Sequence, residues 1–317
     1  MIGIRPLTTG DAERIVGFNK NTDENFMRQW AGRFYVYPLT TEQIIERIRN
    51  TDNTRYFAVL LDNIVIGMAE FDFIKWDEKV CSVCRFIIGE EYRGQGHGVQ
   101  ALDLLCRHAF NELGMLKVKL SVFDFNTSAY KCYIKAGFKM VGEASRPNGW
   151  KAIEMEKAAL TYRMATIDDL ELLTQTRVEF FADIHKDMTD TQKAEIYACN
   201  KEYFEETLHD DTFTAYLVFD EDMLVATSGV NFYKTPPNPK NPTGKTAYIS
   251  NMFTKPEYRS KGIATRLFEM TVVEAQKRGC GKVVLHATDM GRPIYEKLGF
   301  FVPNGAMEYY FEGEQVK

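Results

Sequence analysis

The chain has 317 residues, which is too long for one ordinary hydrophobic core and suits two domains of roughly 150 residues. Hydrophobic residues make up 45% and charged residues 26%, a composition that excludes disordered and fibrous proteins and predicts a soluble globular one. The net charge of −5, without a long run of Lys or Arg, gives no footprint for binding nucleic acid.

The sequence contains neither a targeting signal nor a metal-binding pattern. The first ten residues, MIGIRPLTTG, have no apolar stretch of signal-peptide length, and no segment has enough consecutive apolar residues to span a bilayer. Six cysteines in so long a chain predict no disulfide scaffold, and Cys81 and Cys84 lie in a strand-like run where residues three apart point to opposite faces. The five histidines form no HxxxH pair. We expect a cytoplasmic protein without membrane or nucleic-acid partners and without a metal.

The first half of the chain reads as helices followed by antiparallel strands. A strand-like run at residues 4–8 leads into an amphipathic stretch that starts at Asp11. A second helix is expected at residues 40–50, where Thr40 and Gln43 have capping-box spacing. Apolar runs bounded by turn residues then predict three strands, at residues 55–62, 63–73 and 79–89.

A glycine segment, RGQGHG from Arg93 to Gly98, follows these strands. After it come a strongly helical run at residues 99–113, a strand at residues 117–125 and a short helix at residues 130–138 that ends in Gly-Phe.

The second half repeats this order of elements. A strand and a helix are expected within residues 162–181, followed by a helix at 189–208 and by strands at 213–222, 223–233 and 245–254. The glycine segment RSKGIA lies at 259–264. After it we expect a helix at 265–279, a strand at 282–290 and a short helix at 292–300. The two glycine segments lie 166 residues apart and the two Gly-Phe pairs lie 162 apart. We infer a duplication, with domains at residues 1–157 and 158–317.

Three ligand chemistries are associated with a glycine-rich turn between a strand and a helix. A Walker A loop requires Lys-Ser or Lys-Thr after its last glycine, but Val-Gln follows Gly98 and Ile-Ala follows Gly262. A dinucleotide fingerprint requires GxGxxG in a parallel βαβ unit, whereas the first segment reads GxGxG after a hairpin-like strand. Backbone amides at a helix N-terminus, with Arg93 or Arg259 adding charge, suit a phosphate. A tight turn without a ligand is the alternative, and the repetition of the segment favours phosphate.

Both segments resemble the signature of the GNAT superfamily of N-acetyltransferases, which is Gln or Arg, two variable residues, Gly, one variable residue, and Gly or Ala. The flanking sequences EEYRGQG and PEYRSKG are also similar to the family, as are NTSAYKCYIKAGF and TDMGRPIYEKLGF. The resemblance covers nearly the whole chain as two tandem domains. It implies an α/β fold of the mixed α+β kind, in which each domain has a mostly antiparallel, centrally splayed sheet flanked by helices.

The resemblance implies acetyl-coenzyme A as the cosubstrate. Its pyrophosphate would lie on the amides of residues 94–98 or 260–265, and its pantetheine arm would pair with the splayed fourth strand. Gly98 and Ala264 would keep side chains clear of the ligand. In the first half the implied contacts are Phe86, Ile87, Ile88, Arg93, Gly94, Gln95, Gly96, His97, Gly98 and Asn126. In the second half they are Met252, Phe253, Thr254, Arg259, Ser260, Lys261, Gly262, Ile263, Ala264 and Thr265.

Acetyl transfer by direct attack needs an unprotonated amine and a proton for the leaving thiolate. Tyr133 and Tyr295 occupy the position of the family's general acid, four residues before the glycine of Gly-Phe, and core packing is the alternative for both. Asn126 matches the family's asparagine after the fifth strand, where the second half has Thr288.

The general base is the least defined part of the expected site. Glu70 and Asp72 are the candidates in the first half, and an ordinary surface charge is an equally good interpretation of Glu70. The central strands of the second half contain no carboxylate, although Ser228, Asn231 and Ser250 could order a water molecule.

Acceptor selection is expected from residues 26–40, which are crowded with aromatic residues between two helices and either line a pocket or fill the core. The leading hypothesis is an N-acetyltransferase that acts on a primary amine of a small molecule or on a protein N-terminus. The first half looks similar to the ribosomal-protein and polyamine acetyltransferase branch. The alternatives are a tandem protein that binds acetyl-coenzyme A without catalysis in one or both halves, and a purely structural duplicate. A homodimer is left open.

Overall fold

The computed structural model describes residues 1–50 and 53–303. The chain divides into two units, Met1–Ala159 and Leu160–Lys317, and each is described by itself. The last strand of the first unit, β7 (Lys151–Ala158), contains both residues of the junction expected at 157 and 158.

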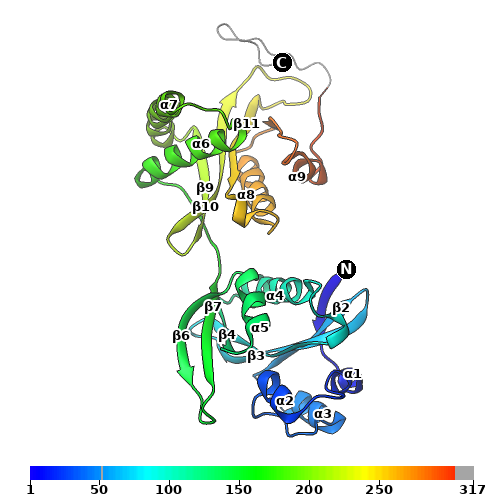
Figure 1. Ribbon diagram of the computed structural model, residues 1–317. Helices are drawn as coiled ribbons and strands as arrows, with labels where there is room; N and C mark the ends of the chain where they lie inside the picture. The colour runs from blue at the N-terminus through cyan, green and yellow to red at the C-terminus, as the bar shows by residue number, and fades with distance from the viewer. Residues whose placement is uncertain (51–52, 304–317) are drawn as a thin grey trace. The chain divides into compact units, whose positions relative to one another are not determined.

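The first unit contains a seven-stranded sheet with helices on both faces (Figure 1). The strand order is β1-β2-β3-β4-β5-β7-β6, and all neighbours are antiparallel except β4 and β5. Its other strands are β1 (Ile2–Pro6), β2 (Arg55–Leu61), β3 (Ile64–Lys75), β4 (Val80–Ile88), β5 (Lys117–Phe123) and β6 (Lys139–Ser145). Its helices are α1 (Ala12–Gly17), α2 (Glu24–Ala31), α3 (Thr41–Asn50), α4 (His97–Arg107) and α5 (Thr127–Lys135), with 3-10 turns at Thr9–Asp11 and Glu90–Tyr92.

Successive side chains of a strand point to opposite faces of the sheet, and this produces two hydrophobic layers in the first unit. Phe57 of β2 and Phe71 of β3 pack with residues of α4 and α5. Tyr56 and Met68 of the same two strands pack with residues of α1, α2 and α3. Each layer therefore has its own set of buried side chains from the same strands.

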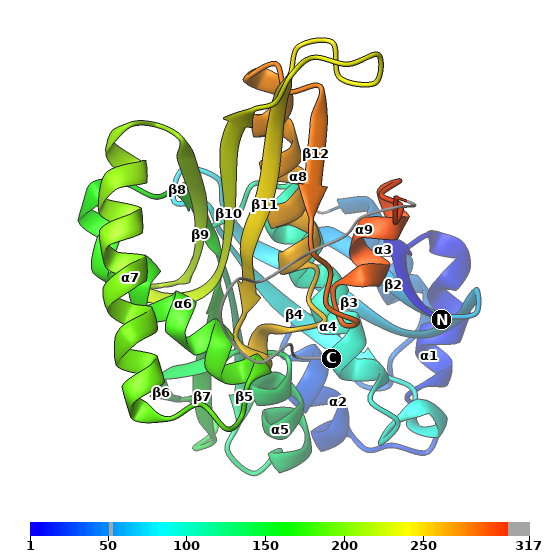
Figure 2. The same cartoon turned by 90° about the horizontal axis from the view of Figure 1, so that it is seen from above.

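The second unit repeats this plan around a five-stranded sheet, in the order β12-β11-β10-β9-β8 (Figure 2). Only β11 and β12 are parallel. The strands are β8 (Thr161–Met164), β9 (Phe213–Asp220), β10 (Met223–Lys234), β11 (Lys245–Thr254) and β12 (Lys282–Leu285). The helices are α6 (Leu170–Ile184), α7 (Asp190–His209), α8 (Ile263–Lys277) and α9 (Arg292–Lys297), with 3-10 turns at Ile167–Asp169 and Pro256–Tyr258. Phe213 and Leu217 of β9 pack with α6 and α7, and Tyr216 and Val218 pack with α8.

The central splay that the resemblance implies is present in both sheets. In the first unit β4 pairs with β5 only as far as Ser82, although β4 continues to Ile88. In the second unit β11 pairs with β12 only as far as Ile249, although β11 continues to Thr254. In each case the end of the longer strand has one edge without a strand neighbour.

Both units begin with the same bidentate ion pair, which supports the duplication. The Arg5 guanidinium donates two hydrogen bonds of 2.7 Å to Asp11, and the Arg163 guanidinium donates two of 2.7 Å to Asp169. In both places the aspartate also closes a capping box with the threonine three residues before it.

Several expectations from the sequence need correction. Part of the aromatic segment at residues 26–40 is helical, because the Asp23 carboxylate accepts a 2.7 Å hydrogen bond from the Phe26 N–H and caps α2. The helix expected at residues 99–113 is α-helical only to Arg107 and ends in a π turn at His108–Glu112. The strands β6 and β7 had no counterpart among the expected elements.

The capping box expected between Thr40 and Gln43 is only half formed. The Gln43 N–H donates to Thr40 Oγ1 at 3.4 Å, but the Gln43 side chain bonds to the backbone of Val36 and Pro38. Gln43 therefore holds the end of the aromatic segment against α3.

Candidate active site

The glycine segments of the two units share one backbone conformation. Gly94 and Gly96 are left-handed, with φ of +75° and +82°, and Gly96 is the N-cap of α4. Ser260 and Gly262 take the same positions with φ of +61° and +80°, and Gly262 is the N-cap of α8. A glycine cap has no side chain that could accept a hydrogen bond from the first-turn N–H groups. Those amides therefore remain available to a ligand.

The space next to these glycines is open. A Cβ built on Gly96 or on Gly262 would have no heavy atom within 4 Å beyond the immediate chain neighbours. Backbone amides and the helix dipole at such an N-terminus attract an anion. A phosphate can thus approach both helix starts without displacing a side chain.

Gly98 has a different environment. A Cβ on Gly98 would lie 3.1 Å from Cys132 Sγ and 3.9 Å from the Phe86 ring. A side chain there would push the first turn of α4 away from α5 and β4. This packing requirement, which the sequence did not reveal, explains the third glycine of the first segment.

The two arginines of the signature tie the glycine segment to the strand before it. Arg93 Nε donates to the Ile88 carbonyl at 2.7 Å, and Arg259 Nε donates to the Thr254 carbonyl at 2.9 Å. Arg259 also forms an ion pair with Asp183 at 2.5 Å. Their geometry fixes the turn, and any contact with a phosphate comes in addition to this role.

The other side chains of the two segments lie around the helix starts. Gln95 Nε2 donates to the Glu91 carbonyl at 3.1 Å, and the His97 ring lies 3.2 Å from the Tyr92 carbonyl. Lys261 lies over the ring of Tyr258. Ile263 is buried in the core, and Ala264 and Thr265 are half-buried in the first turn of α8.

The splayed strand ends hold the residues expected beside the pantetheine arm. Phe86, Ile87 and Ile88 form the end of β4, and Met252, Phe253 and Thr254 form the end of β11. A β-bulge precedes each end, with Arg85 at φ +47° and Asn251 at φ +53°. The bulge turns the strand at the point where it leaves its parallel neighbour.

Tyr133 and Tyr295 are largely buried on α5 and α9, at 9% and 8% exposure. Burial raises the pKa of both hydroxyls above the ordinary value, so both phenols are protonated at neutral pH. Among the residues that the structure describes, neither hydroxyl has a hydrogen-bond partner. The rings pack in the core, against Phe138 and Phe268 respectively, and leave the hydroxyls for another group.

Asn126 caps a helix. Its Oδ1 accepts from the Ala129 N–H at 3.2 Å at the start of α5. Thr288 Oγ1 accepts from the Gly291 N–H at 3.3 Å just before α9. The asparagine and the threonine therefore support the tyrosine-bearing helices in equivalent ways.

Glu70 lies fully buried in a cluster of charges on the face of β3 and β4 that α1, α2 and α3 cover. Its carboxylate accepts from Arg85 Nε at 2.5 Å, from Arg47 at 3.0 Å and from the Tyr35 hydroxyl at 3.2 Å. Asp72 pairs with the same two arginines. Glu70 is therefore held by two guanidinium groups and one hydroxyl.

Arg85 and Arg47 were not among the residues expected from the sequence. Phe34 lies within the expected aromatic segment at residues 26–40, and its ring lies 4.3 Å from Arg85 Cζ and 4.4 Å from Arg47 Cζ. One signal was present: Arg85 is the lone charge in the apolar run VCSVCRFII. A charge in a buried strand requires a partner, and Glu70 and Asp72 are on the strand beside it.

Within residues 160–303, the equivalent face of the second unit has no such cluster. Strand register equates the Glu70–Cys84 pair with Gly229–Ser250, and the bulged Arg85 with Asn251. A hollow of about 390 Å³ lies there. It is lined by Arg177, Asn200, Tyr203, Phe204, Asn231, Tyr248, Ser250 and Asn251. Ser250 and Asn231, two of the expected water-ordering residues, are hydrogen-bonded to each other at 3.3 Å.

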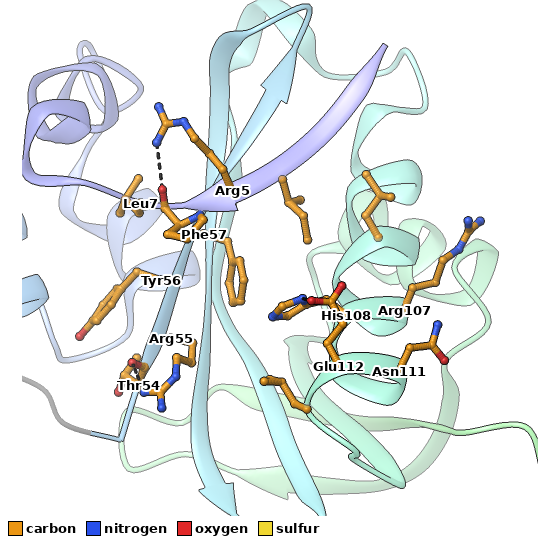
Figure 3. Close-up of a pocket in the computed structure, with 14 residues that line it drawn as sticks. Arg5, Leu7, Thr54, Arg55, Tyr56, Phe57, Arg107, His108, Asn111 and Glu112 are labelled. Atoms are coloured by element: carbon orange, nitrogen blue, oxygen red, sulfur yellow. Dashed lines mark hydrogen bonds and ion pairs between the residues drawn. The ribbon is translucent and has the colours of Figure 1, made fainter.

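A larger hollow, of about 790 Å³, lies in the first unit between β1, β2 and the end of α4 (Figure 3). Several of its charged lining residues are already paired, such as Arg5 with Asp11 and His108 with Glu112. None of its lining residues belongs to the predicted site, so this hollow carries none of the predicted chemistry.

The described residues contain no group of three or more His, Cys, Asp or Glu that could hold a metal ion. All six cysteines, including Cys81 and Cys84, are free thiols. No helix in the described part of the chain is long and apolar enough to cross a membrane.

Comparison with known protein families matches the chain twice to one model, described as the acetyltransferase (GNAT) family, at residues 24–138 and 179–300. The chain belongs to the GNAT family. It is therefore an acyltransferase built from two GNAT repeats, as the glycine segments and the duplicated sheets indicated.

Individual relatives of this GNAT protein are distant. An uncharacterised N-acetyltransferase of Bacillus subtilis strain 168, derived from the SPbeta prophage and called YokL, is 29% identical over 133 residues, which are 41% of this chain and 73% of that protein. The spermine/spermidine N(1)-acetyltransferase of the same organism is 35% identical over 72 residues, which are 23% of this chain and 47% of that enzyme. A crystal structure of a predicted acetyltransferase with acetyl-CoA from Clostridium acetobutylicum is 30% identical, covers 48% of this chain and 96% of its own, and has a TM-score of 0.44.

Proposed function

We propose that this protein transfers an acetyl group from acetyl-coenzyme A to a primary amine of a small molecule or to a protein N-terminus. The observation that carries the proposal is the duplicated cradle: a left-handed glycine, open on one side, caps a helix beside a splayed strand pair in each unit. Further support comes from the relative named for spermine and spermidine.

The cradle suits the charged part of the coenzyme. The amides of residues 94–98 and 260–265 would hold the pyrophosphate, because they are helix N-termini without side-chain caps. The free edge of β4 after Ser82, or of β11 after Ile249, offers main-chain groups to the pantetheine arm. When bound, the coenzyme supplies an acetyl group activated as a thioester.

The tyrosines would act on the leaving group. The amine nitrogen forms a bond to the acetyl carbon as the carbon–sulfur bond breaks, and the sulfur takes the proton of the Tyr133 or Tyr295 hydroxyl. The raised pKa of each buried phenol keeps that proton in place until the thiolate forms. The proton lost by the amine would pass to Glu70 in the first unit and to a water molecule in the second, and a proton from solvent would restore the tyrosine.

Glu70 remains the predicted general base of the first unit, where it forms ion pairs with Arg85 and Arg47. In the second unit Ser228, Asn231 and Ser250 would order a water molecule in place of a carboxylate. Ser228 is fully buried and bonded to Thr271 at 2.7 Å, so Asn231 and Ser250 are the better placed of the three.

A second candidate function is favoured by the charge cluster of the first unit. Glu70, Asp72, Arg47, Arg85 and the Phe34 ring fill the face that is hollow in the second unit. The first unit would then bind acetyl-coenzyme A without transferring its acetyl group, and the second unit would be the catalytic one.

Release of free coenzyme A thiol in the presence of a panel of primary amines tests both candidates. Turnover that survives Tyr133→Phe and disappears in Tyr295→Phe would establish the half-catalytic form. Partial loss of turnover in each of the two single variants would establish two active units. Absence of turnover with every amine, despite binding of acetyl-coenzyme A, would overturn the proposed transfer.

A further inference from the structure

The hollow in the second unit is placed to receive an acceptor. Its strand residues Ser250 and Asn251 directly follow Ile249, the last residue of β11 that pairs with β12. The volume of about 390 Å³ falls at the small end of the range for small-molecule sites. Its walls come from α6 and α7 on one side and from β10 and β11 on the other.

Asn251 is the first sign that this hollow is built for a ligand. The residue is 2% exposed, and both polar atoms of its side chain lack a hydrogen-bond partner in the described part of the protein. A buried carboxamide without partners is costly, and native structures rarely keep one without a reason. Because Asn251 lines the hollow, a ligand inside it can supply the missing partners.

Arg177 is the second sign. Its guanidinium reaches the hollow from α6 and lies 5.3 Å from the Phe180 ring and 4.4 Å from the Phe181 ring. Among the residues that the structure describes, no carboxylate pairs with it, and burial lowers its pKa. A half-buried cation without a counterion is unfavourable until an anion arrives.

Among the residues that the structure describes, no carboxylate lines the hollow, and its titratable members besides Arg177 are Tyr203 and Tyr248. The matching face of the first unit contains two carboxylates for its two arginines. The second unit thus lacks one negative charge where the first unit supplies its own.

We propose that this hollow binds the carboxylate of the acceptor, with Arg177 and the Asn251 amide as donors, so that the second unit acetylates an amino acid. One guanidinium balances one negative charge, which a carboxylate carries, and the small volume suits a single amino acid. A polyamine would instead bring further positive charge to Arg177. The inference rests on the proposed transfer reaction, since it names the acceptor for that reaction.

The test uses the intact chain saturated with coenzyme A. Binding of the twenty proteinogenic amino acids is measured by calorimetry, and each hit is compared with the amine that lacks its carboxylate, such as lysine with cadaverine. We expect at least one amino acid to bind at least tenfold more tightly than its decarboxylated partner. Failure of all twenty to bind at millimolar concentration would overturn the proposal, and so would equal or tighter binding of the partners.

Two variants locate the carboxylate. Arg177→Gln should weaken binding of the amino acid by about tenfold to hundredfold and leave binding of its decarboxylated partner unchanged. Asn251→Gly removes the carboxamide at a left-handed position that glycine tolerates, and should also weaken only the amino acid. Lys277→Gln, which removes an exposed charge at the end of α8, is the matched control and should bind normally.

Measurements of binding and of turnover test the carboxylate site and the transfer reaction separately. Amino-acid binding that depends on Arg177, without thiol release, would support the carboxylate site and contradict the transfer reaction. Thiol release with polyamines in preference to amino acids would support the transfer reaction and contradict the carboxylate site. If Arg177→Gln fails to fold, the comparison is made with Asn251→Gly, and unchanged affinity in that variant would overturn the role of the carboxamide.

Discussion

Replacement of a cradle glycine by glutamate should remove one coenzyme site at a small cost in stability. A Cβ on Gly96 meets no atom within 4 Å, so the cost of Gly96→Glu comes from the left-handed backbone, at about 1–2 kcal/mol. For a unit of this size that corresponds to a fall of about 2–8 °C in Tm. The new carboxylate would face the pyrophosphate, and two like charges about 4 Å apart near a protein surface repel by about 4 kcal/mol. Coenzyme affinity of the first unit should therefore fall at least about a hundredfold.

Gly114→Glu is the matched control for this variant. Gly114 is also left-handed, at φ +68°, and also has open space around its Cβ position, but it lies after the π turn, away from the start of α4. Gly279→Glu is the matched control for Gly262→Glu in the second unit. Gly279 has φ of +73°, and a Cβ built on it would have only Lys245 Nζ within 4 Å, at 3.8 Å. Calorimetry gives affinity and thermal unfolding gives stability. Unchanged affinity in Gly96→Glu, or equal loss of affinity in Gly114→Glu, would refute the phosphate cradle.

Three further predictions concern individual side chains. Tyr133→Phe and Tyr295→Phe should leave Tm and coenzyme affinity nearly unchanged and lower turnover of an active unit by about a hundredfold in a thiol-release assay. A lower Tm with full turnover would mean that the tyrosines serve only to pack the core. Glu70→Gln should destabilise the first unit by about 3 kcal/mol in urea unfolding, because Arg85 stays buried beside a neutral partner. Loss of turnover without loss of stability would instead establish Glu70 as the general base. Arg5 holds the pKa of Asp11 at about 2, against 3.8 in the unfolded chain. The difference in unfolding free energy between wild type and Asp11→Asn should therefore be complete above about pH 4 and vanish as the pH falls through 2, and a difference that stays constant with pH would exclude this ion pair as its source.

Local patterns were enough to predict most of the strands, the glycine segments and the duplication, but not β6 and β7. Hairpin strands, helix starts and left-handed glycines depend on neighbours in sequence, so they can be recognised from short stretches of the chain. The splay of β4 from β5 was also expected, but only through the resemblance to a family.

Long-range register determines what the sequence could not show. The cluster around Glu70 needs Arg85 on the adjacent strand and Arg47 on a helix, which only the folded chain brings together. The orphaned Asn251 depends on a bulge whose position no local pattern marked. Gly98 was expected to keep side chains clear of the ligand, and the sequence did not show that Cys132 on another helix is its close neighbour.

The number of acetyl-coenzyme A molecules bound by the intact chain tests the central claim most directly. Both units have a left-handed glycine cap next to open space, so titration calorimetry should give a stoichiometry near two. Gly96→Glu and Gly262→Glu should each reduce it to near one, and the double variant should bind none. A value near one for the wild-type chain, or a value that neither glycine variant changes, would contradict the account of two independent coenzyme sites.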